Sequence, residues 1–225
     1  MTDGDATGPP ARARVPLRGV VLAVAAAALA GIGAGVAIHE LAAHGSRGAA
    51  AATLPAFHGQ ASWGAGRRPA PAFALDDQNG ALVGLRSLRG RSVLLTFLDS
   101  QCKEECPIQG RELGSILRRL PAAARPALVV VSVDPSGDTP ASIRHAMSRW
   151  HLAGPWPWHW LNGSRAALRG VWKRYGVTVD PGSGDIVHSL VLYLIDRDGY
   201  ERTAYLYPFL PAFVQGDLAR LGAQA

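Results

Sequence analysis

The sequence predicts an α/β fold in which helices pack against a sheet of buried strands. Three apolar runs of strand length, residues 92–98, 127–133 and 189–196, are typical of strands that are buried on both faces. Between the first two lies a segment, residues 108–120, whose apolar residues recur with helical spacing. Strand–helix–strand units of this kind pair in parallel through right-handed crossovers. We therefore expect an α/β sandwich.

The first informative segment along the chain is residues 19–38, which carry no charge. A helix of that length spans about 30 Å, the thickness of a bilayer core. Arginines precede it at positions 12, 14 and 18, whereas Arg47 is the one basic residue that follows soon after. This asymmetry predicts a cytoplasmic tail at residues 1–18, a single transmembrane anchor at residues 19–38 and an extracytoplasmic domain at the cell membrane.

Two rival interpretations of residues 19–38 are a cleaved signal peptide and a buried helix of a soluble protein. Small residues such as Ala28 and Ala30 could mark a cleavage site. We favour the anchor because the apolar run is long for a signal peptide. The anchor and the signal peptide both export the domain, so its thiols are expected to meet an oxidising environment.

Residues 39–70 show no sustained period and few large apolar side chains, so we interpret them as a flexible linker. His44 and His58 lie in this segment and are expected to be solvated. The folded domain is expected at residues 71–225. Its first element is a hairpin over residues 73–85, because two short strand-like runs flank a "QNG" turn.

Capping residues place two helices in the middle of the domain. Thr139 and Pro140 suit the N-cap and the first helical position of a helix over residues 139–152. Gly176 suits the C-terminal end of a helix over residues 164–176.

The last elements complete a recognisable order. An "RDG" turn follows the strand at residues 189–196 and leads into a second strand at residues 200–207, and a final helix runs roughly over residues 211–221. A hairpin, a strand and helix in alternation, and a final helix together predict a thioredoxin-like sandwich with an N-terminal hairpin. In open α/β sheets, ligands collect beyond the carboxyl ends of the strands, and the "CKEECP" motif follows such an end.

The net charge of +6 does not indicate nucleic-acid binding. Lysine occurs only as Lys103 and Lys173, and the arginines are scattered rather than gathered into a basic stripe with aromatic residues. We therefore expect no nucleic-acid partner.

The two cysteines of the chain, Cys102 and Cys106, stand together in "CKEECP". Pro107 suits the first position of the following helix, which would make Cys106 its N-cap or place it just before. A helix N-terminus lowers the pKa of a nearby thiol, whereas Glu104 and Glu105 oppose this effect, and the sequence does not decide between them. Such a pair can close to a structural or redox disulfide, or chelate a soft metal such as Cu(I).

A third ligand would distinguish these chemistries, and His188 is the candidate. It stands at the entrance to the strand at residues 189–196, which faces the cysteine loop in a thioredoxin-like sheet. A turn residue or a hydrogen-bonded core histidine is the competing interpretation. His145, His151 and His159 show no comparable pattern and are expected at the surface or in local packing.

The chain resembles the Sco/SenC copper chaperones over about residues 71–222. The resemblance lies in "FALDDQNG", "LRGRSVLLTFLDSQCKEECP", "VVVSVDPSGDTP", "HWLNG", "VWKRYGV" and "VHSLVLYLIDRDG". It implies that Cys102, Cys106 and His188 bind copper, with the carboxylate of Glu104 between the cysteines as in many members. Many members have a proline directly after the first cysteine, where this chain has Lys103.

Two thiolates and one imidazole suit three-coordinate Cu(I) and can hold Cu(II) with a further ligand, whereas structural zinc normally takes four protein ligands. Asp134 and Asp138, in "VDPSGDTP", are expected on the same rim of the sheet, ordering a turn or orienting the site. Trp156, Trp158 and Trp160 are expected to fill a local core; an exposed part of this cluster could meet a partner.

Two functions follow from these residues. The first is a membrane-tethered copper chaperone, and the resemblance implies the dinuclear copper centre of cytochrome c oxidase as its target. The second is a thiol–disulfide oxidoreductase in which Cys102 attacks and Cys106 resolves. Both need a thiol-reducing partner, because a Cys102–Cys106 disulfide would bind no copper. A peroxiredoxin is disfavoured by Asp99, three residues before Cys102, where a threonine or serine is usual. A purely structural disulfide would not explain His188.

Overall fold

The computed structural model describes residues 57–182 and 186–224. The predicted cytoplasmic tail and transmembrane anchor lie outside these residues. Within the described part, none of the helices combines the length and the apolar character needed to cross a membrane.

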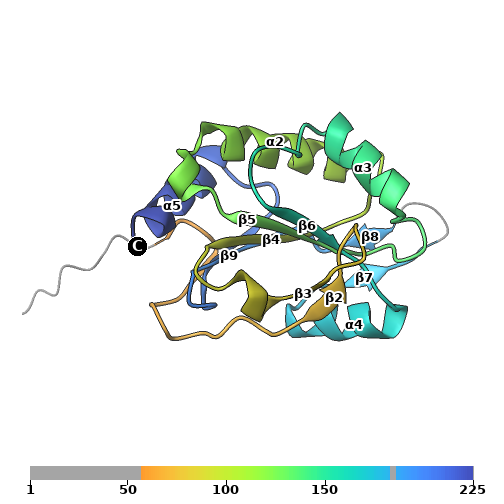
Figure 1. Ribbon diagram of the computed structural model, residues 1–225, viewed down its shortest axis with the longest axis horizontal. Helices are drawn as coiled ribbons and strands as arrows, with labels where there is room; N and C mark the ends of the chain where they lie inside the picture. Colours follow the sequence, from red (N-terminus) through yellow and green to blue (C-terminus); the bar gives the residue numbers. More distant parts are fainter. Residues whose placement is uncertain (1–56, 183–185, 225) are drawn as a thin grey trace, which may run out of the picture. The chain divides into compact units, whose positions relative to one another are not determined.

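A six-stranded sheet forms the centre of the domain (Figure 1), with strand order β1-β10-β9-β4-β5-β6. Strands β4, β5 and β6 run parallel, whereas β9 pairs antiparallel with β4 and β10 antiparallel with β9. β1 forms one edge of the sheet and pairs antiparallel with β10. The bounds are β1 Ala61–Ser62, β4 Val93–Leu98, β5 Ala127–Ser132, β6 Trp158–Leu161, β9 Val191–Ile195 and β10 Glu201–Leu206.

Two layers cover the sheet (Figure 1). Helices α2, α3 and α5 pack on one face over a core that includes Leu94, Leu113 and Trp160. The opposite face carries α4 and the β2–β3 hairpin over a core that includes Phe97 and Trp172. The bounds are α2 Glu105–Arg119, α3 Pro140–Arg149, α4 Arg165–Arg174, α5 Pro211–Ala223, β2 Ala74–Asp76 and β3 Leu82–Gly84, with short 3₁₀ turns η1 Leu85–Leu88 and η2 Ala122–Ala124.

Local signals explain where the predicted elements begin and end. The Thr139 side chain accepts a hydrogen bond from the Ser142 N–H at 3.1 Å, and Pro140 opens α3 as expected. Gly176 follows α4 with a φ of +67°, a backbone conformation that glycine adopts without steric cost. Gly80 turns the β2–β3 hairpin with a φ of +78°. The strand order along the chain and the thioredoxin-like layering therefore agree with the sequence analysis.

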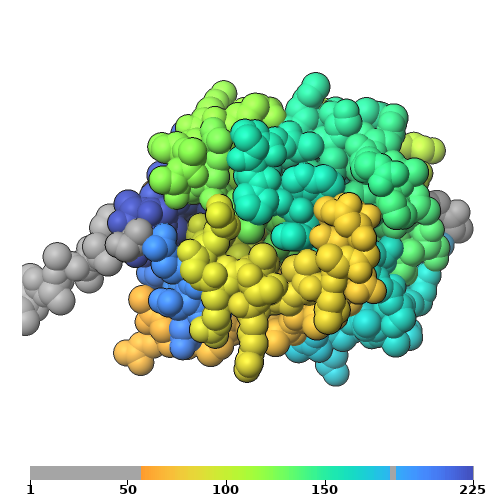
Figure 2. Space-filling view, viewed as in Figure 1, coloured from red at the N-terminus to blue at the C-terminus, as the bar shows by residue number. Residues whose placement is uncertain are grey.

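The structure adds elements that the sequence pattern did not reveal. Trp158 and Trp160, which were expected to fill a local core, also belong to β6 at the edge of the sheet, and Trp156 and Trp160 are buried as expected. A two-stranded ribbon, β7 Val179–Asp180 and β8 Val187–His188, precedes β9. The hairpin is a separate two-stranded sheet, and a hydrogen bond from Asn162 N to Asp76 O at 2.8 Å ties it to the segment after β6. Figure 2 shows the hairpin segment, in orange, against the teal surface of that region.

The expectation that residues up to 70 form a flexible linker needs correction for its described part, residues 57–70. Here the chain contributes β1 to the sheet, and Ala70 is buried. His58 is exposed to solvent as expected, but it is docked on the domain, because its Nδ1 lies 2.8 Å from the carboxylate of the fully buried Asp217 and its ring stacks on Phe213. A polar segment can dock in this way when its backbone completes a sheet edge, a property that side-chain periodicity does not report.

Candidate functional site

The two cysteines lie where the sequence predicts, beyond the carboxyl end of the central strand β4. The helix that follows begins at Glu105, two residues before the expected start at Pro107. Cys106 therefore lies inside the first turn of α2 and is fully buried, whereas Cys102 precedes the helix and is partly exposed.

Hydrogen bonds to buried groups hold the loop that carries Cys102. The carboxylate of Asp138, which is buried, accepts the Ser100 N–H at 2.8 Å and the Trp160 indole N–H at 2.9 Å. The Cys102 N–H donates to the Asp99 carbonyl at 3.3 Å. Asp138 thus fixes the loop two residues before the first cysteine.

Asp134 has the turn-ordering role that its position predicts. Its side chain accepts the Ser136 N–H at 3.2 Å and its carbonyl accepts the Asp138 N–H at 2.9 Å. Sequence reasoning could name both aspartates as rim residues, but the link from Asp138 to Ser100 depends on tertiary packing.

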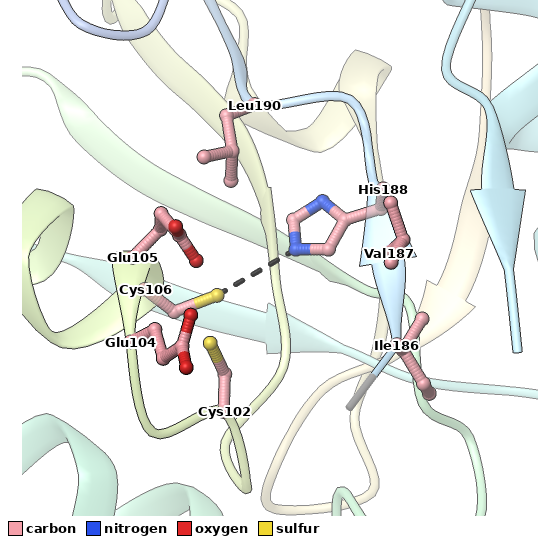
Figure 3. A pocket seen from close by; sticks show the side chains of 8 residues that line it. All are labelled: Cys102, Glu104, Glu105, Cys106, Ile186, Val187, His188 and Leu190. Atoms are coloured by element: carbon pink, nitrogen blue, oxygen red, sulfur yellow. Dashed lines mark hydrogen bonds between the residues drawn. The ribbon is translucent and has the colours of Figure 1, made fainter. Parts of the chain in front are cut away.

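His188 reaches the cysteines from the small ribbon, on β8. Its Nδ1 lies 3.2 Å from the carbonyl oxygen of Ser189, and its Nε2 lies 3.5 Å from the sulfur of Cys106. An Nδ1–H that donates to this carbonyl leaves the Nε2 lone pair free to face Cys106. In Figure 3 the imidazole and the two sulfur atoms point toward one another across the pocket.

A cavity of about 380 Å³ opens at this point. Its lining combines the two cysteines and His188 with acidic residues from the start of α2 and apolar residues from the segment that carries the histidine. The full lining is Cys102, Glu104, Glu105, Cys106, Ile186, Val187, His188 and Leu190 (Figure 3). The apolar wall could not be assigned from the sequence, because β7 and β8 are too short to give a periodic pattern.

The two thiols have opposite electrostatic character. A hydrogen bond from the Cys106 side chain, assisted by backbone N–H groups of Cys106 and Glu104 at the helix start, lowers the pKa of Cys102 to about 6 from its ordinary value of 9.0. The same interaction with Cys102, together with burial, raises the pKa of Cys106. The hydrogen bond between the two thiols and the burial of Cys106 therefore place the thiolate at Cys102, outside the helix, rather than at Cys106.

Burial lowers the pKa of His188, so its imidazole is neutral at neutral pH. Of the three groups, Cys106 then keeps its thiol proton, while Cys102 is a thiolate and the imidazole of His188 is neutral. A soft cation that replaces this proton meets two sulfur donors and one nitrogen donor.

The spacing is close to what a shared ion requires. Bonds of about 2.3 Å to sulfur and about 2.0 Å to nitrogen, opened by roughly 120°, place the two donor atoms about 3.7 Å apart. The Cys106–His188 separation of 3.5 Å approaches this value. Among the described residues, no group of three or more Cys, His, Asp or Glu side chains is arranged so that it could hold a metal ion.

The other histidines that the sequence analysis considered in the domain lie away from the cavity. His145 is exposed on α3, and His159 lies 3.1 Å from the carboxylate of Asp77, in local packing as expected. His151 follows α3 with a φ of +51°.

The fold and the site define a class of protein: a thioredoxin-like α/β sandwich with a dithiol at the end of its central strand and a histidine facing it. The SCO1/SenC family model matches residues 65–221, and the chain belongs to this family. The copper-bound ScoI of Arabidopsis thaliana has the same fold, with a TM-score of 0.62 and 20% identity over 69% of this chain and 99% of that one.

Two further relatives are more similar in sequence. The copper-bound ScoI of Bradyrhizobium japonicum is 29% identical over 68% of this chain and 99% of that chain, with a TM-score of 0.56. A candidate copper-binding protein of Stutzerimonas stutzeri is 30% identical over 59% of this chain and 66% of its own length. The chain spans only about half of the mitochondrial SCO2 homolog of Bos taurus, with 30% identity over 56% of this chain and 50% of that protein.

Proposed function

We propose that this protein is a copper chaperone that holds copper through Cys102, Cys106 and His188. One observation carries the proposal: His188 lies 3.5 Å from the Cys106 sulfur although 82 positions separate them in the sequence. A disulfide does not require an imidazole beside it, whereas a soft metal ion would use the imidazole as a ligand. Two related proteins add support, because one was solved with copper bound and another is named for copper binding.

The cargo and its transfer follow from the donor set. Sulfur and imidazole ligands suit Cu(I), and Cu(II) can be held with one further ligand, for which Glu104 lines the pocket. Cys102 is the exposed donor and Cys106 the buried one. An acceptor can therefore displace Cys102 first and take the ion by ligand exchange.

The cellular setting belongs to the same proposal. Residues 19–38 would anchor the chain in the cell membrane by a single span, with the copper pocket on the extracytoplasmic side. The resemblance of the motifs to copper chaperones makes a copper-accepting subunit of cytochrome c oxidase the proposed partner. A thiol-reducing protein would be a second partner, since only the dithiol binds copper.

A second candidate function is thiol–disulfide exchange, which the opposite pKa shifts of the two thiols favour. The Cys102 thiolate would attack one sulfur of a target disulfide, and the other target sulfur would leave as a thiolate. Cys106 would then lose its proton, attack the Cys102 sulfur and release the second target thiol. The target is reduced, the Cys102–Cys106 pair is oxidised, and the reducing partner restores the dithiol.

An anaerobic copper titration of the fully reduced protein tests the chaperone. We expect one copper per chain, with affinity lowered by at least about tenfold in His188→Ala, because a nitrogen ligand that donates an electron pair to the metal is lost. Sulfur-to-Cu(II) charge-transfer absorption reports the thiolates. The control is His145→Ala, which removes an exposed histidine outside the pocket and should leave stoichiometry and affinity unchanged.

The same variants separate the two functions. If wild type binds no tight copper, or if His188→Ala binds it equally well, the three-ligand site is wrong. Reduction of a disulfide target that survives in His188→Ala and disappears in Cys102→Ser would then leave exchange as the function.

A further inference from the structure

A second pocket lies at the opposite end of the sheet from the cysteines, where β4 begins. Three arginines from separate segments line it: Arg91 before β4, Arg125 before β5 and Arg197 after β9. The cavity measures about 230 Å³, and Ser92 and Gly90 complete its polar lining. This volume admits a small anion but no extended ligand.

Backbone hydrogen bonds fix the segments that carry these arginines. The Gly90 N–H donates to the Arg197 carbonyl at 2.9 Å, which joins the entry of β4 to the turn after β9. The Ala127 N–H donates to the Ser92 carbonyl at 2.9 Å. The guanidinium groups are therefore brought together by the fold rather than by chance proximity of loose loops.

The positive charge of the pocket is not balanced within the described residues. Arg68 pairs with Glu201 and Arg202 pairs with Asp196, whereas Arg91, Arg125 and Arg197 form no ion pair with a described residue. The side chain of Ser92, which is largely buried, also makes no hydrogen bond to a described residue. Like charges held together in this way attract an anion.

Helix capping explains only one of the three arginines. Arg125 donates from Nε to the carbonyls of Leu117 and Leu120 at 3.2 and 3.1 Å, so it serves the C-terminal end of α2 and keeps its terminal N–H groups for another partner. Arg91 and Arg197 make no such bond among the described residues and are left without a structural role.

We propose that this arginine pocket binds a phosphate group. Guanidinium groups match the geometry of phosphate oxygens and donate paired N–H bonds to them, and the hydroxyl of Ser92 adds a further donor. The group can come from free phosphate or from the headgroup of an anionic phospholipid.

The position of the pocket suits a headgroup. Phe57, where the described chain begins, packs on the guanidinium of Arg202 at 5.0 Å, and Arg202 reaches Asp196, the neighbour of Arg197, at 3.5 Å. Phe57 thus lies on the side of the domain that carries the arginine pocket. A lipid source rests on the proposed anchor, whereas phosphate binding itself does not.

Calorimetric titration of the full chain in an uncharged detergent tests the pocket. One arm uses inorganic phosphate, and the other uses short-chain phosphatidylglycerol against short-chain phosphatidylcholine. We expect saturable binding that weakens by at least about tenfold in the double variant Arg91→Ala/Arg197→Ala, because two charge-assisted contacts are lost. The matched control, Arg165→Ala/Arg169→Ala, removes two exposed arginines from α4 and should bind as wild type does.

Each result has a definite meaning. Arginine-dependent binding of phosphate, of phosphatidylglycerol or of both supports the pocket. It also identifies whether the bound phosphate group comes from free phosphate or from a lipid headgroup. Equal binding in the two double variants, or no saturable binding in wild type, overturns it. Copper stoichiometry measured on the same samples is expected to be unchanged, so failure of this proposal is distinguishable from failure of the copper site.

Discussion

Four-residue spacing gives Cys102 and Cys106 different surroundings. Cys106 is buried in the first turn of α2, while Cys102 stands in front of the helix. There a hydrogen bond from the Cys106 thiol, assisted by backbone N–H groups at the helix start, stabilises the charged form of Cys102. The thiolate is therefore the partly exposed sulfur, and the protonated thiol is the buried one beside His188. This arrangement is compatible with both proposed functions, copper transfer by ligand exchange and disulfide exchange.

The pH dependence of alkylation tests this asymmetry. Because the thiolate is the reactive species, the rate of Cys102 alkylation by iodoacetamide should rise with pH, be half-maximal near the pKa of about 6 and level off above it. Cys106→Ala removes the thiol that donates to Cys102, so the midpoint should move toward the ordinary value. Mass spectrometry of the reduced protein measures the rate at each cysteine.

An ordinary profile centred near 9.0 in wild type would show that the helix start and Cys106 do not stabilise the Cys102 thiolate. If the Cys106→Ala variant has the same alkylation midpoint as wild type, the Cys106 thiol does not stabilise the Cys102 thiolate.

At the scale of elements, α2 packs closely against α3 and the segment after it because two glycines remove side chains from the contact. A Cβ atom on Gly110 would lie 2.9 Å from the ring of Trp150, and one on Gly114 would lie 2.2 Å from the carbonyl oxygen of His151. The cysteine loop depends on this contact indirectly, since Asp138, just before α3, holds Ser100.

Gly114→Ala should lower the free energy of unfolding by about 1–3 kcal/mol, because the added methyl must displace backbone rather than a flexible side chain. The loss should appear although alanine favours a helix by up to about 1 kcal/mol over glycine. Urea unfolding of the unit Pro55–Ala225 measures it.

The comparison is Gly216→Ala on α5, where a Cβ meets nothing within 4 Å. There the free energy of unfolding should rise by up to about 1 kcal/mol. Equal effects of the two substitutions would argue against close packing of α2.

At the scale of the whole molecule, residues 57–70 belong to the folded domain. Arg68 pairs with Glu201, whose side chain is 1% exposed, and His58 bonds to Asp217, which is fully buried. Two carboxylates in the interior therefore depend on a segment that looks like a linker.

A fragment that begins at residue 71 should be less stable than one that begins at residue 55 by about 1–3 kcal/mol, because Glu201 would remain buried without the half-exposed Arg68 that pairs with it. A fragment that begins at residue 65 keeps Arg68 and should fall between them. Thermal and urea unfolding rank the three. If the three fragments have the same midpoints of thermal and urea unfolding, residues 57–70 contribute nothing to stability.

Much of the fold is visible in the sequence where a local rule applies. The central strands are continuous apolar runs, Thr139 and Pro140 predict the start of α3, and Gly176 predicts the end of α4. The boundaries of these elements therefore fall within two or three residues of those predicted. Strands β6, β7 and β8 were missed because two to four residues cannot display a period. The start of α2 predicted from the sequence is two residues too late, because a proline is tolerated at any position of the first turn of a helix.

The sequence by itself determined the chemistry of this protein: two soft sulfur donors at a strand end, a distant histidine, the thioredoxin-like order of elements and membership of the family. Only the tertiary structure decided which thiol carries the charge, which residues hold the loop and which arginines share a pocket. The reason is physical. Propensity and periodicity act over neighbouring residues, whereas desolvation, hydrogen bonding and charge pairing act between groups that the sheet brings together from far apart in the chain.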